Sequence, residues 1–455
     1  MTMGLRYGAI ELGVTSRFNW IWDDRGSKGK RDGAFYTPAR SVLESLLGWR
    51  VLAHIGRPDH EHLDRQRTAI LAREVDAANQ MLKSPTDFER IWEDRASGAK
   101  AYGSCWRPVP PAGYVSLGDV FVQGWDKPDP RSYWCVRKTP VGGRSYVREG
   151  RIGASIYDDS GTGAHMDLSV WQIDPPSYPD DSTERLVLGL DAFVAGNQHH
   201  SRPNRTVYVL DLPALVVKRP EPTRPVLTSH SVPEQETLKV VDRAVTVPCT
   251  LVKDPGKEAD WQVANSPFYT LERRVNYYRQ LFYDNSGGST EENNRQQVTT
   301  GISTESSEEY SRRTSITVSA SVGISIKAFS ASVETSVTTE MGYSSRYGVT
   351  QFQQETKDWS MTVPAGKSAA LWSPRHEIVA LRQNGEVVGG QGGLKCDVDV
   401  RVKTEFPEGS AVKVFVDDIE EAEDLKAQPF GESRSNVPER TPDIVTDTVT
   451  EIATD

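Results

Sequence analysis

The sequence predicts a mainly β protein in two parts, a pseudo-threefold, β-prism-like amino-terminal domain and an elongated antiparallel β domain that follows it. Three observations predict this architecture. A short motif recurs three times in the first half, strand-like alternation dominates the second half, and a proline-rich stretch separates the two. We therefore expect an amino-terminal domain over 1–215, a linker over 216–235, an elongated domain over 236–419 and an acidic, disordered tail over 420–455.

The repeat in the first half aligns without a gap. The motif is an isoleucine, an aromatic residue, two acidic residues and a small-residue turn. Its copies begin at Ile21, Ile91 and Ile156, at offsets of 70 and 65 residues. Three similar β units predict a pseudo-threefold arrangement in which the acidic turns are equivalent. Each copy is followed by an apolar strand, at 48–52, 113–118 and 185–189.

One long helix is expected in this domain, between the first two copies. Apolar residues at helical spacing run from about residue 60 to 83, and Ser84-Pro85 would end the helix. We interpret this segment as a helical insertion that packs on the outside of the prism.

The acidic turns allow three interpretations. Asp24 and Asp32, and likewise Asp159 and Asp167, stand eight residues apart around Gly and Ser, a spacing that suits calcium binding through carboxylate oxygens. Tyr102 at the matching position of the second copy disfavours this, and we predict no metal and no cofactor. The other two interpretations are capping of the turns by their own carboxylates and contact with a sugar or receptor. The residues considered for that contact are Asp24, Gly26, Asp94, Asp159 and Gly161.

Residues 314–341 alternate between apolar and small hydroxyl side chains, and Lys327 is the only charged residue between Thr314 and Val333. The apolar parity changes at Ala328, which predicts one β-hairpin with its tip near Lys327 and Ala328. Each arm is about as long as the ~9–11 residues that a tilted strand needs to cross a bilayer. The predicted membrane-inserting residues are Ile316, Val318, Ala320, Val322, Ile324, Ile326, Lys327, Ala328, Phe329, Ala331, Val333 and Val337. The residues predicted to face a wet lumen are Ser319, Ser321, Ser330, Ser332 and Glu334.

Composition excludes several classes of function. The chain has 53 basic and 63 acidic residues and a formal charge of −10, which argues against nucleic-acid binding and against binding to anionic lipid by charge alone. The start of the sequence lacks the pattern of a secretory signal, so we expect synthesis as a soluble protein without a signal peptide. The four cysteines do not form a metal-ligand spacing, and we expect buried free thiols.

An enzyme is the class least favoured by the sequence. The chain has eight histidines, and none lies in a recognisable triad, zinc or phosphate-binding motif. We expect no catalytic residues.

Two stretches resemble known families. The run Trp106-Arg107-Pro108, the segment 111–119, Lys127-Pro128 and Cys135-Val136-Arg137 resemble the signature of the vacuolar protein sorting-associated protein 62 family, over roughly the first 215 residues. That name records a sorting phenotype and implies no chemistry.

The hairpin and the run 361–367, Met-Thr-Val-Pro-Ala-Gly-Lys, resemble the aerolysin superfamily of β-pore-forming toxins, in particular its epsilon-toxin and mosquitocidal-toxin branch, over about Ala244 to Asp417. The resemblance implies a soluble monomer that binds a receptor, oligomerises and unfolds one hairpin per protomer into a shared barrel. Only a closed ring of hairpins pairs every backbone group in lipid. Some relatives lose a carboxy-terminal propeptide, and cleavage at Arg434 or Arg440 would remove the tail.

We therefore predict a pore-forming toxin, with insects as a candidate target, that acts extracellularly at the membrane of its target cell. Its expected partners are a glycan or protein receptor on the cell surface, membrane lipid and further copies of itself. The alternative is a carbohydrate-binding lectin or adhesion protein without pore activity, and a sorting or structural protein is third. The scarcity of charge in the hairpin favours the pore, since a permanently solvated hairpin tolerates several charges.

Overall fold

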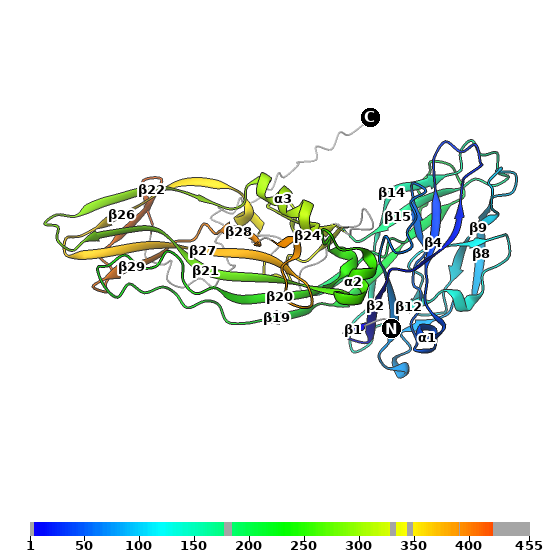
Figure 1. The fold of residues 1–455 in the computed structure, drawn as a ribbon, viewed down its shortest axis with the longest axis horizontal. Coiled ribbons are helices and arrows are strands. Elements are labelled where there is room, and N and C mark those ends of the chain that lie inside the picture. The colour runs from blue at the N-terminus through cyan, green and yellow to red at the C-terminus, as the bar shows by residue number, and fades with distance from the viewer. Residues whose placement is uncertain (1–3, 177–183, 328–333, 344–348, 391, 422–455) are drawn as a thin grey trace, which may run out of the picture.

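The protein is elongated, with its amino-terminal domain at one end and long, nearly parallel strands extending to the other (Figure 1). The computed structural model describes residues 4–176, 184–327, 334–343, 349–390 and 392–421. The fold is mainly β, as predicted, and its α-helices are α1 (Val42–Leu46), α2 (Ala259–Asn265) and α3 (Thr304–Thr314) within those residues. Several predicted site residues lie outside the described residues, namely Ala328, Phe329, Ser330, Ala331, Ser332, Val333, Arg434 and Arg440.

Three equivalent three-stranded antiparallel sheets carry the sequence repeat. In each sheet the second strand of the repeat is central and pairs with both neighbours, and a β-bulge interrupts the first hairpin near its aromatic residue. This regularity confirms the predicted pseudo-threefold architecture. The sheets are β3 (Phe18–Asp23), β4 (Ala34–Pro38) and β5 (Ile55–Arg57); β8 (Asp87–Glu93), β9 (Gly103–Val109) and β11 (Val120–Gln123); and β14 (Arg151–Asp158), β15 (Ser169–Asp174) and β17 (Phe193–Gly196).

A second set of three sheets repeats with the same symmetry. The apolar strands expected after each copy are β10, β16 and, in the first copy, a single bridge between Arg50 and Ala72. The sheets are β1 (Gly4–Tyr7), β2 (Ile10–Thr15) and β6 (Ala69–Glu74); β7 (Leu82–Lys83), β12 (Cys135–Arg137) and β10 (Tyr114–Val115); and β13 (Val147–Glu149), β18 (Tyr208–Pro213) and β16 (Arg185–Leu188).

The predicted long helix at about 60–83 is wrong. Residues 69–74 form β6, which pairs along its whole length with β2, and only a short 3₁₀ turn at Ala77–Asn79 is helical. The reason is the repeat itself, because β6 occupies the place that β12 and β18 hold in the other two copies. Pairing with β2 and burial of Leu71 and Ala72 favour a strand here. The helical spacing of the apolar residues does not exclude one, because it is also compatible with a short strand.

Aromatic side chains from all three repeats fill the centre of the amino-terminal domain. Trp22, Trp92 and Tyr157 stand at the equivalent aromatic position of the repeat and are fully buried. Phe35 and Phe121 stack with ring centroids 3.6 Å apart between them. All four cysteines are free and buried, as expected, and Cys105 lies in this core.

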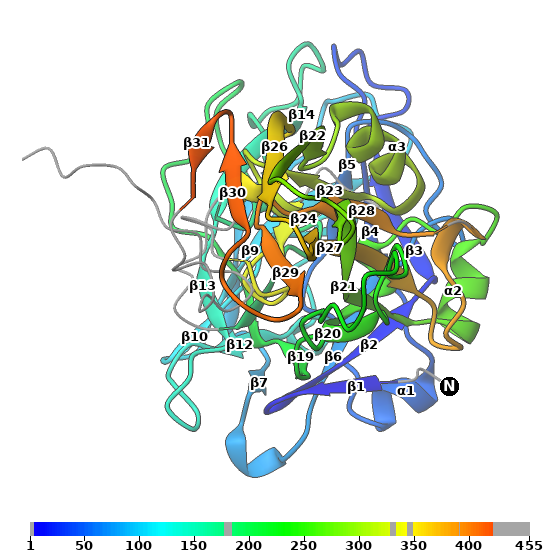
Figure 2. The same ribbon diagram turned by 90° about the vertical axis from the view of Figure 1, so that its left-hand side faces the viewer.

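Two long sheets form the carboxy-terminal domain. Its longest strands are β21, with 18 residues, and β27, with 15 residues. They are antiparallel neighbours and give the domain its elongated shape (Figure 1). Viewed end-on, the second sheet stacks beside the first (Figure 2). The first sheet contains β19 (Leu215–Lys218), β20 (Val240–Pro248), β21 (Phe268–Asn285), β27 (Lys367–Leu381), β28 (Leu394–Asp397) and β29 (Val402–Phe406); the second contains β22 (Glu292–Thr300), β26 (Glu355–Val363), β30 (Lys413–Val416) and β31 (Ile419–Glu420).

A small third sheet lies between α3 and the amino-terminal domain. Its strands are β23 (Ile316–Ser319), β24 (Gly323–Lys327) and β25 (Glu334–Ser336), in that spatial order. It holds the segment that the sequence singles out as membrane-inserting.

Candidate functional site

The apolar face of the β23–β25 sheet is completely buried. Ile316, Val318, Ile324, Ile326 and Val337 have no exposed surface. They belong to one contiguous core that also takes in residues of β20, β21 and β27 and of β16 and β18 in the amino-terminal domain. The apolar face of this amphipathic segment is therefore stored where the two domains meet.

The segment does not form the single hairpin expected from the sequence. β23 and β24 already pair with each other, with Ile316 opposite Ile326 and Val318 opposite Ile324, so the predicted first arm is folded back on itself. The turn lies at Ala320–Val322 rather than at Lys327 and Ala328, and Val322 is partly exposed there. Gly323 has φ +67°, a conformation that glycine adopts without strain, which permits a turn that strand alternation alone does not reveal.

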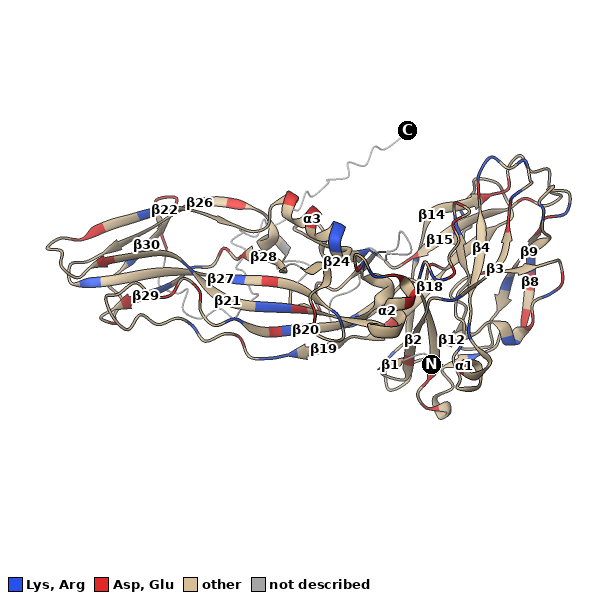
Figure 3. Cartoon of the chain, in the orientation of Figure 1, with Lys and Arg blue, Asp and Glu red and all other residues tan. Residues whose placement is uncertain are grey.

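Helix α3, which the sequence pattern did not predict, covers this sheet. Ser303 caps its first turn, and the Ser307 hydroxyl donates a 2.6 Å hydrogen bond to the carbonyl of Val318 in β23. Glu305 lies in its first turn and Arg312 and Arg313 in its last, charges that suit the helix dipole (Figure 3). The capping pattern Ser-Thr-Glu-Ser at 303–306 is a helix-start signal that was present in the sequence.

The hydroxyl side chains predicted to line a lumen occupy different places in this state. Ser319 and Ser321 lie in and beside the turn and hydrogen-bond each other at 3.0 Å. Glu334 begins β25 and is paired in register with Lys327. The roles of these residues in a pore stay predictions.

The amino-terminal domain contacts the end of the segment directly. The Thr335 hydroxyl, fully buried, donates a 3.1 Å hydrogen bond to the carbonyl of Val187 in β16. The backbone N–H of Arg185, also in β16, donates a 2.8 Å hydrogen bond to Oε1 of the buried Glu340. Sequence reasoning missed both contacts, because nothing in the local pattern relates residue 185 to residue 340.

A buried polar cluster anchors the chain just beyond the segment. Arg273 and Asp242 form an ion pair that is almost fully buried, and Arg273 also donates to the carbonyl of Gly342 at 3.3 Å. The guanidinium lies 4.9 Å from the ring centroid of Tyr343, whose hydroxyl is 2.8 Å from Nδ1 of His376. Burial and then the charge of Arg273 hold the pKa of His376 well below its usual range.

The acidic turns of the amino-terminal domain interlock around the pseudo-threefold axis. Trp22 donates its indole N–H to Asp94 of the second repeat at 3.1 Å, and Trp92 donates to Asp159 of the third at 2.8 Å. The contact from the third repeat to the first differs, because the buried hydroxyl of Tyr157 has no hydrogen-bond partner among the described residues. Backbone hydrogen bonds close the ring all the same, from Lys100 to Arg25, from His165 to Arg95 and from Lys30 to Ser160.

Two of the three repeated carboxylates cap their own turns, whereas Asp94 accepts from the indole N–H groups of Trp22 and Trp125. Asp24 accepts from the N–H of Gly33 at 2.9 Å, and Asp159 accepts from that of Leu168 at 2.7 Å. All three carboxylates are buried, so Gly26 and Gly161 are the surface members of the residues considered for receptor contact. A receptor role for the turns stays a prediction.

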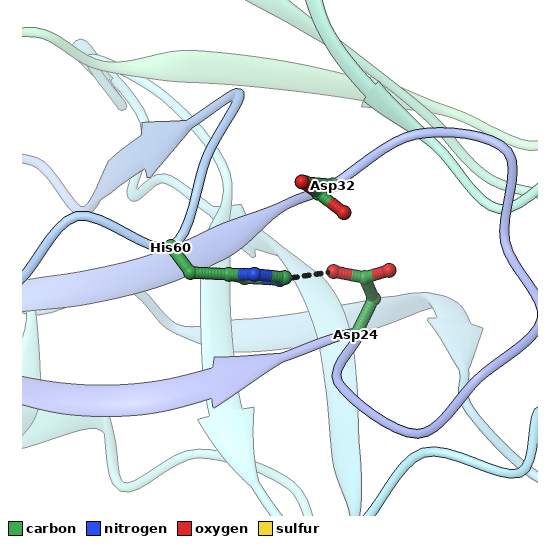
Figure 4. A group of neighbouring side chains, drawn as sticks. All are labelled: Asp24, Asp32 and His60. Atoms are coloured by element: carbon green, nitrogen blue, oxygen red, sulfur yellow. Dashed lines mark hydrogen bonds and ion pairs between the residues drawn. The ribbon is translucent and has the colours of Figure 1, made fainter.

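Asp24, Asp32 and His60 offer three potential metal-ligand atoms within 4.8 Å of one another (Figure 4). His60 Nε2 is 2.7 Å from Asp24 Oδ1, and in the third repeat His199 Nε2 is 2.7 Å from Asp159 Oδ1. In the second repeat the indole N–H of Trp125, which cannot bind a metal, contacts Asp94 at the same 2.7 Å. All three repeats thus place a side-chain ring nitrogen within hydrogen-bond distance of the buried aspartate. A hydrogen bond accounts for this geometry without a bound ion.

Comparisons with known proteins match two different families in two parts of the chain. Residues 2–205 match the family described as Vacuolar protein sorting-associated protein 62, which confirms that resemblance, and residues 244–365 match the family described as Insecticidal Crystal Toxin, P42. A comparison with curated proteins gives no match.

Two solved structures are similar at low scores. GNIP1Aa from Chromobacterium piscinae is 25% identical with a TM-score of 0.33, over 42% of this chain and 34% of GNIP1Aa, so this chain spans about a third of that protein. Cry35Ab1 is 11% identical with a TM-score of 0.31, over 89% of this chain and 91% of Cry35Ab1. The family match supports an insecticidal toxin and does not single out the aerolysin superfamily. No α-helix within the described residues has the length and hydropathy of a membrane span.

Proposed function

We propose that this chain is an insecticidal toxin that oligomerises at a target membrane and inserts residues 314–341 of each protomer into a shared, aerolysin-like β-barrel. The amino-terminal domain would attach the protein to the cell surface through a glycan or protein receptor. The match to an insecticidal crystal toxin family over residues 244–365 supports this proposal because it overlaps the segment.

The observation that carries the proposal is the storage of the β23–β25 sheet. The described strands of a nearly uncharged amphipathic segment bury their apolar face between α3, the long strands and the amino-terminal domain. Polar contacts hold the far end of the segment at Thr335 and Glu340 and the chain just beyond it at Gly342. A pore-forming segment has to be shielded from water in this manner until it meets lipid.

Insertion requires the segment to rearrange. β23 has four residues and β24 has five, about half of the ~9–11 that a tilted transmembrane strand needs. Opening the turn at Ala320–Val322 would join β23 and β24 into one arm in which Ile316, Val318, Ile324 and Ile326 keep the same parity and face lipid.

A disulfide across β23 and β24 tests this rearrangement. Thr317 and Ser325 are register partners in antiparallel strands, so their Cα atoms lie at a separation that a disulfide spans. The Thr317→Cys/Ser325→Cys variant would keep the turn closed when oxidised. The matched control is Thr299→Cys/Thr356→Cys, another register pair, on β22 and β26 outside the segment. The four native cysteines are buried, which limits mispairing.

The readout is dye release from liposomes made with target-membrane extract, with and without reductant. We expect release by wild type and by the oxidised control, none by the oxidised Thr317→Cys/Ser325→Cys variant, and recovery after reduction. Release by the oxidised variant at the wild-type rate would overturn the opening of this turn. Binding without release by every form would favour the lectin alternative.

A further inference from the structure

Helix α1 projects apolar side chains into solvent. Val42, Leu43, Leu46 and Leu47 are 79%, 53%, 80% and 38% exposed, and no residue of the helix is buried. They make up four of the exposed large apolar side chains within the described residues and follow one another along a single surface element. A contiguous exposed apolar patch of this kind marks an interaction site.

The helix is held in shape despite its lack of burial. The Ser41 hydroxyl accepts a hydrogen bond from the N–H of Glu44, and the Glu44 carboxylate accepts one from the N–H of Ser41, which completes a capping box. Glu44 is the only acid in α1, and this contact directs its carboxylate to the amino-terminal end of the helix. The apolar side chains are thus presented on an ordered turn.

Two arginines at the base of α1 contact no carboxylate in the part of the chain that the structure describes. Arg40 and Arg50 both stack on Trp134, with their guanidinium carbons 5.0 and 4.6 Å from the centroid of its ring. Arg50 donates to the carbonyls of Ser45 and Trp49, and Arg40 donates to those of Trp49 and Arg131, all neutral acceptors. Neither makes a salt bridge with any residue that the structure describes, and the acid that acts on the pair from a distance is Glu74, whose charge raises the pKa of Arg50 against the effect of burial. Two guanidiniums thus converge here with no carboxylate in direct contact among the described residues.

Electrostatics of the pair agrees with this geometry. Burial and then the neighbouring charge of Arg50 lower the pKa of Arg40, so an anion at this place would relieve the repulsion between the two guanidiniums. Arg73 stacks nearby on Trp49 and differs from the pair, since Glu11 binds it with two hydrogen bonds.

We propose that α1 and the Arg40–Trp134–Arg50 stack dock the amino-terminal domain on an anionic phospholipid surface. The four aliphatic side chains enter the interfacial region, and the two guanidiniums bind headgroup phosphates. The proposal goes beyond the pore, because attachment by this site needs no insertion of β23–β25. It also agrees with the net charge of −10, since the site combines apolar contact with local charge instead of relying on charge alone.

A second protein molecule fits this site less well than lipid. An isologous contact with another copy would bring two arginine pairs together without acids to neutralise them. Protein interface cores also favour exposed aromatic side chains, whereas the exposed side chains of α1 are aliphatic.

Vesicle flotation tests the apolar half of the site. Wild type should float with phosphatidylcholine vesicles that contain phosphatidylserine, and Leu43→Ser/Leu46→Ser should lower partitioning by roughly tenfold or more. The matched control is Val226→Ser/Leu238→Ser, two side chains that are 74% and 84% exposed outside the amino-terminal domain, and it should bind as wild type. Absence of wild-type binding, or equal binding by the α1 variant, would overturn the proposal.

The charged half has its own variant. Single Arg40→Gln and Arg50→Gln substitutions should each weaken binding to phosphatidylserine vesicles about fivefold and reduce its dependence on salt. Inorganic phosphate should not displace the protein from vesicles at matched ionic strength. Complete displacement by phosphate under that condition would show a simple anion site and overturn the membrane assignment.

Flotation and dye release separate this proposal from the pore. Binding without release from the same vesicles supports the docking site while it counts against insertion. Release that is unaffected in Leu43→Ser/Leu46→Ser supports insertion while it overturns the docking site.

Discussion

The backbone N–H of Arg185 donates a 2.8 Å hydrogen bond to Oε1 of Glu340, which links a strand of the amino-terminal prism to the end of the buried amphipathic segment. Thr335 makes a second link to the same strand through Val187. The domain that would find the cell surface therefore also holds the segment that would enter the membrane. Movement between the domains would release both contacts together.

Removal of one link should make insertion easier. Thr335→Val keeps the shape of the side chain and loses the hydrogen bond to Val187, at a cost of about 1 kcal/mol in the free energy of unfolding. We expect faster dye release per bound molecule than wild type. Thr299→Val, on the exposed face of β22, is the control and should change neither quantity. An unchanged release rate for Thr335→Val would show that the contact is structural only.

A charge at Val322 should separate folding from insertion. Val322 is in the turn between β23 and β24 and is partly exposed, so Val322→Asp should leave the unfolding free energy close to that of wild type. In the proposed barrel the same side chain faces lipid near mid-membrane, where an Arg or Lys costs ~2–4 kcal/mol and an Asp less. Liposome binding should survive in Val322→Asp while dye release falls, and Val322→Ala is the control. Full release by Val322→Asp would place this residue outside the lipid face.

The hydrogen bonds from indole N–H groups to aspartates of the next repeat should stabilise the amino-terminal domain. Trp92→Phe removes the N–H that Asp159 accepts and leaves a buried carboxylate one donor short, which should cost at least ~1–3 kcal/mol in urea unfolding. Trp20→Phe also removes an indole donor, to Asp23, from a side chain that is partly solvent-exposed, and its cost should be smaller. Equal losses of unfolding free energy in Trp92→Phe and Trp20→Phe would show that the hydrogen bond between repeats has no special role.

The second acidic turn offers a stabilising substitution. Gly26 and Gly161 have φ of +94° and +88°, and the equivalent residue of the second repeat is Ala96, with φ +68°. Because the left-handed conformation costs a side-chain-bearing residue roughly 1–2 kcal/mol, Ala96→Gly should raise the unfolding free energy by about 0.5–1 kcal/mol. Gly161→Ala should lower it. Thermal unfolding of both variants provides the comparison, and a loss of stability in Ala96→Gly would contradict the argument.

Two buried histidines predict a loss of stability in acid. Burial lowers the pKa of His54 to about 4, and that of His376 lies well below its usual range. Both values are below the ~6.5 of an unfolded chain, so the unfolded state binds more protons as the pH falls below that value, and stability drops. At about pH 5 His54 accounts for about 2 kcal/mol of lost unfolding free energy, and His376 adds to the loss in the same direction.

Gln variants isolate this effect. Buried carboxyls with a raised pKa, such as Asp119, change stability in the opposite direction, so the wild-type slope alone is a mixture. Urea unfolding at about pH 7.5 and pH 5 should show a smaller loss in His54→Gln and His376→Gln than in wild type. An equal pH dependence in all three proteins would contradict the assignment.

The sequence repeat made the fold of the amino-terminal domain predictable. The helix predicted at about 60–83 was wrong because the spacing of apolar residues was used there instead of the repeat. Ile21, Ile91 and Ile156 were enough to place three equivalent hairpins, because the motif is longer than chance allows and its copies align without gaps. The same symmetry would have placed a strand at 69–74, where apolar side chains three and four residues apart also suit a helix.

The storage of the segment was beyond the local pattern. Alternation of apolar and hydroxyl residues predicted strands that the structure has at Ile316–Ser319, Gly323–Lys327 and Glu334–Ser336. Gly323 inside the predicted first arm was the one visible sign of an earlier turn. The partners of Thr335 and Glu340 lie about 150 residues away in sequence, and the ion pair of Arg273 with Asp242 joins two strands through side chains. Contacts of this kind depend on the tertiary arrangement, which periodicity does not encode.

The hydrogen bonds between the repeats of the prism also bear on the order in which it can fold. Each buried indole at Trp22 and Trp92 finds its acceptor in the repeat that the chain produces next, so neither repeat supplies the acceptor for its own indole N–H. A fragment that ends after the first or second repeat would leave an orphaned donor in an apolar core and should not persist as a folded unit. The amino-terminal domain thus becomes stable only when its last repeat has closed the ring, and truncation within it should abolish the whole domain rather than shorten it.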